Sequence, residues 1–190
     1  FILNWILFSS SNVNNFDFLV RGVDRIFISD SLRVNLEPEN KEIKIQKNRN
    51  FSYSGFINTQ NFRFIGKNFN FVYDSFLVHM PIIDEIKLAI TKGKKKNDAG
   101  KSRVLGNELK YSSGTLYINK PGNKSATKSF PQYPIFDATS GATVYFNKED
   151  INGGAYDTTI KFEIPPFRLD SLSSDDPHSI GFDGTFKSGG

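Results

Sequence analysis

Residues 62–80 read FRFIGKNFNFVYDSFLVHM and contain the pattern that decides the fold. In Phe69-Asn70-Phe71-Val72-Tyr73, aromatic residues recur at every second position. A period of two places alternate side chains on opposite faces of a β-strand. Gly66-Lys67-Asn68 has the composition of a turn, so residues 62–73 predict a hairpin. Pro81 follows the run from Phe76 to Met80 and predicts the end of that strand.

The same alternation continues on both sides of this stretch, with Gly, Asn, Asp, Ser and Pro between the runs. The pattern predicts an all-β fold: an extended, curved, mainly antiparallel sheet, either a β-groove or an open sandwich, with long polar loops and little helix. Further strands are expected at 16–20, 32–36, 43–45, 51–53, 86–90, 114–119, 142–146, 159–164 and 180–186. Loops are expected at 97–100 and 122–133, a hairpin at 147–154, and single helical turns at 82–85 and 103–109.

The composition excludes several classes of protein. The 190 residues include 19 Phe but no Cys, which rules out disulfides, thiolate zinc sites and a Cys nucleophile. The two His, at 79 and 178, are too far apart to favour a multi-His metal site, and no apolar run approaches the roughly 20 residues of a membrane-spanning helix. The many Phe predict an apolar sheet face. Periodicity does not decide whether a second layer covers that face or an apolar ligand does.

Charge is distributed unevenly along the chain. Residues 1–91 carry 10 basic and 9 acidic side chains, residues 92–128 carry 10 and 2, and residues 129–190 carry 4 and 9. The basic middle stretch suits either contact with phosphate head groups or a solvated loop region. No helix-turn-helix, zinc-finger, RRM or KH pattern accompanies it, so we expect no nucleic-acid partner.

We expect residues 1–190 to be a single β-rich segment of a longer chain. The sequence begins with Phe1 rather than Met and ends at Gly190, directly after an apparent strand. A subdivision into 1–91 and 110–190, joined by the basic Gly/Ser/Asn-rich region 92–109, is compatible with the pattern. An ordinary small domain is the alternative.

Two short motifs are weak candidates for binding or catalytic chemistry. Gly100-Lys101-Ser102 resembles the end of a P-loop, but the position that needs the first glycine is Lys95, so a flexible loop explains it better. The cluster at 173–179, with two Asp and His178, suits a turn better than a cation or catalytic site.

The acidic residues beside strands are the last candidates for chemistry. Asp74, Asp84 and Asp170 fit turn caps better than a glycosidase pair. His79 lies within an apolar run and suits a structural role. We therefore predict a non-enzymatic protein with no catalytic residue, metal or cofactor.

Several short phrases resemble the long β-rich envelope proteins of Gram-negative bacteria, of the AsmA/TamB-like kind, in the Phe/Asn/Lys-rich style of the Bacteroidetes. They lie within 51–90 and 114–190 and contain no catalytic signature. Two features depart from that family: residues 1–190 do not include the N-terminal anchor helix expected of it, and residues 92–128 are unusually polar, both of which an internal segment of a longer chain would explain. The phrases are FNFVYDSF (69–76), MPIIDEI (80–86), SGTLYIN (113–119), YPIFD (133–137) and FDGTF (182–186).

The resemblance implies a long twisted β-groove on the periplasmic side of a membrane in the bacterial cell envelope. Its partners would be phospholipid or another acyl-chain lipid and the remainder of the same chain, with membrane contact made by segments outside these residues. The alternatives are an extracellular β-sandwich module for adhesion or glycan binding and, third, a fragment of a carbohydrate-active enzyme. The lipid-binding lining would comprise Phe62, Phe64, Phe69, Phe71, Tyr73, Phe76, Leu116, Ile118, Val144, Phe146, Phe162 and Ile164.

Overall fold

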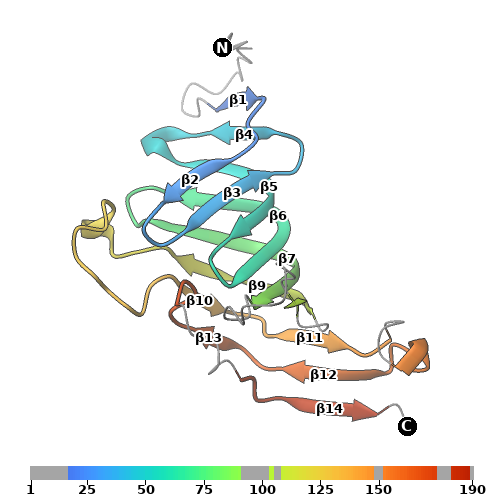
Figure 1. Cartoon of the computed structure of the whole chain (residues 1–190). Helices are drawn as coiled ribbons and strands as arrows, with labels where there is room; N and C mark the ends of the chain where they lie inside the picture. The colour runs from blue at the N-terminus through green and yellow to red at the C-terminus, as the bar shows by residue number, and fades with distance from the viewer. Residues whose placement is uncertain (1–16, 91–102, 105–107, 148–151, 175–180, 189–190) are drawn as a thin grey trace, which may run out of the picture.

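The computed structural model describes residues 17–90, 103–104, 108–147, 152–174 and 181–188. Their strands form one 14-stranded, antiparallel sheet that does not close into a barrel (Figure 1). The all-β prediction is therefore confirmed. Within the described ranges, helical structure is limited to three 3-10 turns, and no helix is long and apolar enough to cross a membrane.

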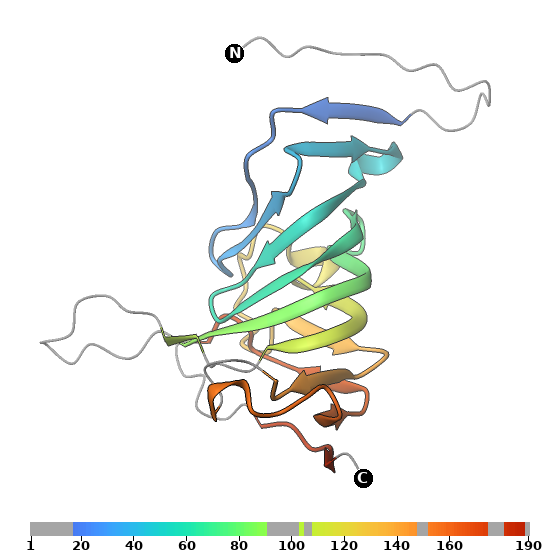
Figure 2. The same ribbon diagram turned by 90° about the vertical axis from the view of Figure 1, so that its right-hand side faces the viewer.

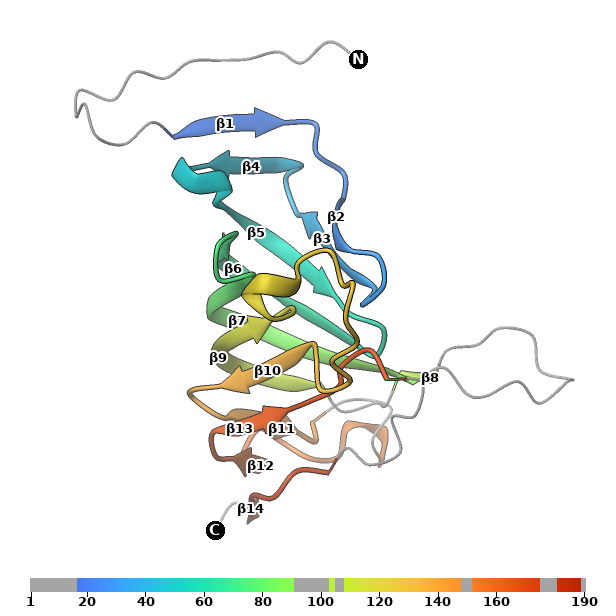
Figure 3. The same ribbon diagram turned by 90° about the vertical axis from the view of Figure 1, so that its left-hand side faces the viewer.

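The strands follow one another across the sheet in the order β1-β4-β5-β6-β7-β9-β11-β12-β14. Two branches leave this path: β2 and β3 beside β5, and β10 and β13 beside β9. β1 and β14 lie at opposite ends of the stack (Figures 2 and 3). The bounds are β1 Phe18–Arg21, β2 Ile26–Ser29, β3 Val34–Pro38, β4 Glu42–Ile45, β5 Phe51–Asn58, β6 Phe62–Val72, β7 Leu77–Ile90, β8 Arg103–Val104, β9 Leu109–Tyr117, β10 Ile135–Ala138, β11 Ala142–Tyr145, β12 Ile160–Ile164, β13 Phe167–Leu169 and β14 Thr185–Ser188.

The predicted hairpin at 62–73 is wrong, because these residues belong to one strand, β6, and the turn before β7 comes at 73–76. β6 pairs with β5 and β7 on both sides of Gly66, where a register shift marks a bulge. Asn68 takes φ 57°, and a Cβ on Gly66 would lie 2.1 Å from the Ile82 carbonyl oxygen. Gly66-Lys67-Asn68 therefore forms a bulge that bends β6, a strand paired on both edges, and not a hairpin turn.

The predicted strand end at Pro81 is also wrong, as is the helical turn at 82–85. β7 continues through Pro81, and its pairing with β9 shifts register between Met80 and Ile83. Pro81 and Ile82 are exposed in this bulge, which accommodates a residue that has no N–H to donate.

The remaining expectations concern shorter elements. The loop at 122–133 is confirmed, while β2, β10 and β13 were not predicted. β11 and β12 pair antiparallel, as a hairpin at 147–154 requires, although 148–151 lie outside the described residues. Residues 103–104 form β8 rather than a helical turn, and the loop at 97–100 lies outside the described residues. β7 pairs with β9, so the described parts of 1–91 and 110–190 share one sheet.

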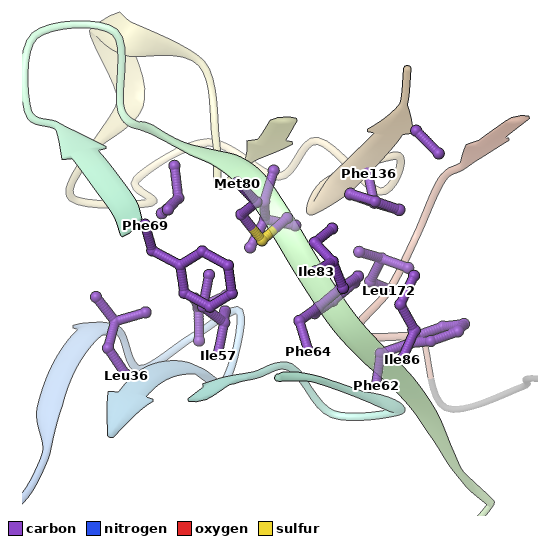
Figure 4. Packing of buried hydrophobic residues seen from close by; sticks show 14 of the residues in the cluster. Leu36, Ile57, Phe62, Phe64, Phe69, Met80, Ile83, Ile86, Phe136 and Leu172 are labelled. Atoms are coloured by element: carbon purple, nitrogen blue, oxygen red, sulfur yellow. The ribbon is translucent and has the colours of Figure 1, made fainter. Parts of the chain in front are cut away.

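One face of the sheet, here called the inner face, carries a single hydrophobic cluster (Figure 4). Phe64 on β6 and Phe136 on β10 are three strand steps apart, which in a flat sheet would separate them by about 14 Å. Their ring centroids are 4.8 Å apart. The sheet therefore curls, and the β10–β13 branch covers the middle of the inner face.

A short segment ties this branch to the opposite side of the curl. In residues 171–174, the strap, the Leu172 N–H donates to the Pro134 carbonyl oxygen (3.1 Å) and the Leu172 carbonyl oxygen accepts from the Asn61 N–H (3.3 Å). The Asn61 side chain donates to the Ser174 carbonyl oxygen (2.6 Å), and the Ser173 hydroxyl donates to the Leu32 carbonyl oxygen. The strap thus joins the β10–β13 branch to the β5–β6 and β2–β3 turns.

Candidate functional site: the apolar inner face

Two rows of directly paired apolar residues cross the inner face from strand to strand. The long row has nine members on nine strands, from β2 to β14: Ile26, Leu36, Ile57, Phe64, Ile86, Leu109, Val144, Phe162 and Phe186. At about 4.8 Å between neighbouring strands, this row follows the sheet for about 38 Å.

The second row runs beside the long row through the central strands β5, β6, β7 and β9. It starts on β1 and ends on β13, so the two rows diverge where the sheet branches. Its members are Phe18, Ile45, Phe51, Phe71, Val78, Leu116, Phe136 and Leu169. The inner face is therefore a continuous apolar track that runs perpendicular to the strands.

All twelve predicted lining residues belong to the inner-face cluster or pack against it. Five are members of the two rows: Phe64, Val144 and Phe162 in the long row, and Phe71 and Leu116 in the second. The other seven flank the rows: Phe62, Phe69, Tyr73, Phe76, Ile118, Phe146 and Ile164. The alternation of the sequence thus selected residues that the fold brings together.

Exposure changes along the track. Nine of the twelve predicted lining residues are buried, none of them more than 8% exposed, and Phe64 among them contacts Phe136 of the β10–β13 branch. Only Tyr73, Phe146 and Phe162 are partly accessible. In the long row, exposure rises from 0% at Phe64 to 56% at Phe186. The protein's own side chains fill the central part of the track, and the track opens toward β14.

The open end is an aromatic cluster. The ring centroids of Phe146 and Phe186 lie 5.8 Å apart, and Phe162 faces Phe186 directly across β12 and β14. A Cβ on Gly184 would lie 2.7 Å from the Phe162 ring, so the glycine lets that ring lie close to the backbone. Phe186 is not among the predicted lining residues, although it is the last residue of the strand expected at 180–186, which could have indicated it.

Phe167 and Phe182 extend the aromatic contacts back to the buried centre. The Phe182 ring centroid lies 5.2 Å from that of Phe167, which lies 5.9 Å from Phe136. Neither residue is among the predicted lining residues: β13 has three residues, too few for a period to be visible, and Phe182, expected within a strand at 180–186, lies before β14.

The titratable residue Tyr53 belongs to the inner-face cluster. Tyr53 is buried, and its hydroxyl reaches only the Phe56 carbonyl oxygen, at 3.5 Å. Burial raises the pKa of the Tyr53 phenol well above its usual value of 10.0, because the apolar surroundings disfavour the phenolate.

The polar candidates do not converge. His79 Nδ1 lies 3.2 Å from the Thr115 hydroxyl in an exposed contact, and the Asp170 carboxylate pairs with Arg168 at 2.9 Å. Within the described ranges, no group of three or more His, Asp or Glu could hold a metal ion. Ser173 belongs to the strap, whereas 175–180, with His178, lie outside the described residues, as do Lys95 and residues 100–102.

The opposite, outer face has a hollow of about 390 Å³ beside β9 and β11. Tyr111, 68% exposed, lies edge-to-face with Tyr145 at a centroid distance of 6.3 Å. Glu108, Lys110 and Asn147 contribute polar groups to the same hollow.

Comparisons of the chain with models of known families, with curated proteins and with solved structures find no match.

Proposed function

We propose that this chain is a non-enzymatic β-groove segment of a bacterial cell-envelope protein that holds or conducts lipid acyl chains between membranes, on the periplasmic side. The observation that carries the proposal is the long row, an unbroken apolar track across nine strands. Its direction, along the sheet rather than along a strand, is the direction in which an acyl chain would lie in a groove. Apolar side chains offer no polar group that would select one lipid, which suits transport.

The open end of the track is where we place the first contact with lipid. Phe146, Phe162 and Phe186 form an aromatic surface that the described residues leave partly uncovered. Each methylene moved from water onto such a surface contributes about 0.8 kcal/mol when it is fully buried. A partly covered acyl chain is thus held without a specific head-group contact.

The outer edges of β1 and β14 support a longer groove. No described strand pairs with either edge, and all four residues of β14 are exposed. An unpaired edge presents a row of free N–H and C=O groups. In the proposed protein, strands from the remainder of the same chain extend the sheet at these edges and continue the track.

Binding of a fluorescent fatty acid, cis-parinaric acid, tests the proposal. The chain offers a matched pair of double variants, because Phe162 faces Phe186 and Lys161 faces Lys187 in the same register. We expect Phe162→Ser with Phe186→Ser to weaken probe binding at least tenfold, since each partly buried Phe contributes on the order of 1 kcal/mol or more. Lys161→Ser with Lys187→Ser, on the outer face, should leave it within twofold. A well-folded parent chain that binds no probe would overturn the proposal.

The hollow at Tyr111 and Tyr145 favours a second candidate function, glycan binding by the outer face. Two aromatic rings beside Glu108, Lys110 and Asn147 combine an apolar platform for sugar C–H groups with hydrogen-bonding partners for hydroxyls. Binding of the parent chain to a glycan array, together with loss of that binding in Tyr111→Ala, would support this function. Binding of both proteins, or of neither, would count against it.

A further inference from the structure

A positively charged rim lies where strands of the central sheet end. Three connections meet there: 46–50 between β4 and β5, 73–76 between β6 and β7, and 118–130 after β9 (left side of Figure 1). They carry five cationic side chains and one carboxylate, that of Asp74. The five, here called the basic rim, are Lys47, Arg49, Lys120, Lys124 and Lys128.

None of these five cations forms an ion pair with a described residue, whereas most other described basic residues do. Nearby charges of both signs neutralise each other: Asp17 pairs with Lys44 at 2.7 Å, and Asp170 with Arg168. Five cations against the single carboxylate of Asp74 leave the three connections with a net charge of +4 and with no ion pair between described residues.

Tyr73 draws two of the cations together at the edge of the apolar track. The Arg49 guanidinium lies 4.7 Å from the Tyr73 ring centroid, and the Lys124 ammonium 5.1 Å from it. Tyr73 itself packs edge-to-face on Phe71, a member of the second row. Uncompensated cations and the apolar inner face thus meet at one residue.

The rim is held in place by hydrogen bonds of two Asn side chains, Asn123 and Asn50. Asn123, 5% exposed, donates from its side chain to the Lys128 carbonyl oxygen (2.8 Å) and accepts from the Lys128 N–H (3.0 Å). The Asn50 side chain accepts from the Tyr73 N–H (2.9 Å), which fixes the 46–50 connection against the 73–76 turn. The cations are therefore presented by ordered backbone.

We infer that the basic rim docks on an anionic phospholipid surface, with Arg49 and Lys124 meeting head-group phosphates. Charge complementarity carries the inference: five cations without an acidic partner among the described residues, clustered on ordered loops, match a surface of phosphates. The choice of a lipid phosphate rests on the proposed lipid function and on the apolar surface that reaches the rim at Tyr73. A phosphate there would leave its acyl chains beside the inner face.

Vesicle flotation at physiological ionic strength tests the inference. The vesicles contain phosphatidylcholine alone or mixed with phosphatidylglycerol. We expect the parent chain to float only with the mixed vesicles. Arg49→Gln with Lys124→Gln should weaken this binding roughly 25-fold, because each cation near an anionic surface contributes about fivefold.

The matched control removes the same charge elsewhere. Lys67 and Lys187 are exposed, have no ion pair with a described residue and lie outside the rim segments. Lys67→Gln with Lys187→Gln should weaken binding less than threefold. An equal loss in both double variants, or binding of the parent to phosphatidylcholine alone, would overturn the rim as the docking site. Displacement by excess inorganic phosphate at constant ionic strength would overturn the assignment to lipid.

The two proposals can fail separately. The rim variant should keep its binding of cis-parinaric acid, because Phe162 and Phe186 are unchanged and lie on β12 and β14, whereas the rim lies on the connections of the central strands. If the parent chain binds vesicles through the rim but binds no cis-parinaric acid, the docking proposal stands and the groove proposal is overturned. If it binds cis-parinaric acid but does not float with the vesicles, only the docking proposal is overturned. Circular dichroism of each variant verifies that the sheet is folded.

Discussion

Leu172 in the strap provides the sharpest test of how the inner face is closed. Its side chain is 1% exposed and points into the cluster that contains Phe136, Ile83 and Ile86 (Figure 4). Phe136 is held by the pairing of β10 with β9 and β13, and Ile83 and Ile86 by the pairing of β7 with β6 and β9. Collapse around a smaller side chain is therefore restricted, which places Leu172→Ala in the middle of the 2–5 kcal/mol range for buried Leu, at about 3 kcal/mol.

Urea and thermal unfolding followed by circular dichroism measure this cost. For a chain of this length, about 3 kcal/mol lowers the melting temperature by roughly 6–12 °C. Ile82→Ala is the control, because Ile82 is 43% exposed in the β7 bulge, and its loss should cost less than about 1 kcal/mol. Equal effects of the two substitutions would refute the packing role of the strap. Faster amide exchange at Asn61, whose N–H donates to the Leu172 carbonyl oxygen, would report local release of the strap.

Two further predictions concern backbone and pH. Gly66→Ala should destabilise the fold by about 2–3 kcal/mol in urea unfolding, because its Cβ meets the Ile82 carbonyl oxygen, whereas Gly122→Ala, with nothing within 4 Å, should be nearly neutral. The raised pKa of Tyr53 means that the unfolded chain releases its phenolic proton first, so stability should fall as the pH rises above 10. Tyr53→Phe should reduce this fall, and a pH profile unchanged from that of the parent would contradict the assignment.

The local sequence pattern predicted which residues of a strand share a face, but it did not predict where the strands end. The period of two identified which residues of β6 face inward, because alternation is a property of each strand alone. Gly66 and Pro81 are strong local signals for a turn and a strand end, yet both lie in bulges of strands that are paired on both edges. Long-range pairing there outweighs the local preference, and no single-strand pattern reveals it.

The coverage of the inner face depends on contacts between residues far apart in the sequence. The strap contributes four residues and reaches Asn61 and Leu32, more than 100 positions away. β10 and β13 have four and three residues, too few for a period to be read. An apolar face could therefore be predicted from the sequence, but the burial of its centre could not.

The burial of the centre divides the proposed function into separable steps. Under the proposed function, lipid would contact the aromatic cluster at Phe186 and the rim at Tyr73 while the strap stays closed, since both regions are accessible in this structure. Passage along the whole long row requires Phe64, which is 0% exposed, to become accessible, and hence requires the strap to release. If Leu172→Ala raises the number of fatty-acid probes bound per folded chain, the centre belongs to the lipid path. If the number stays constant, the centre is a packed core, and lipid binding is confined to the two open regions.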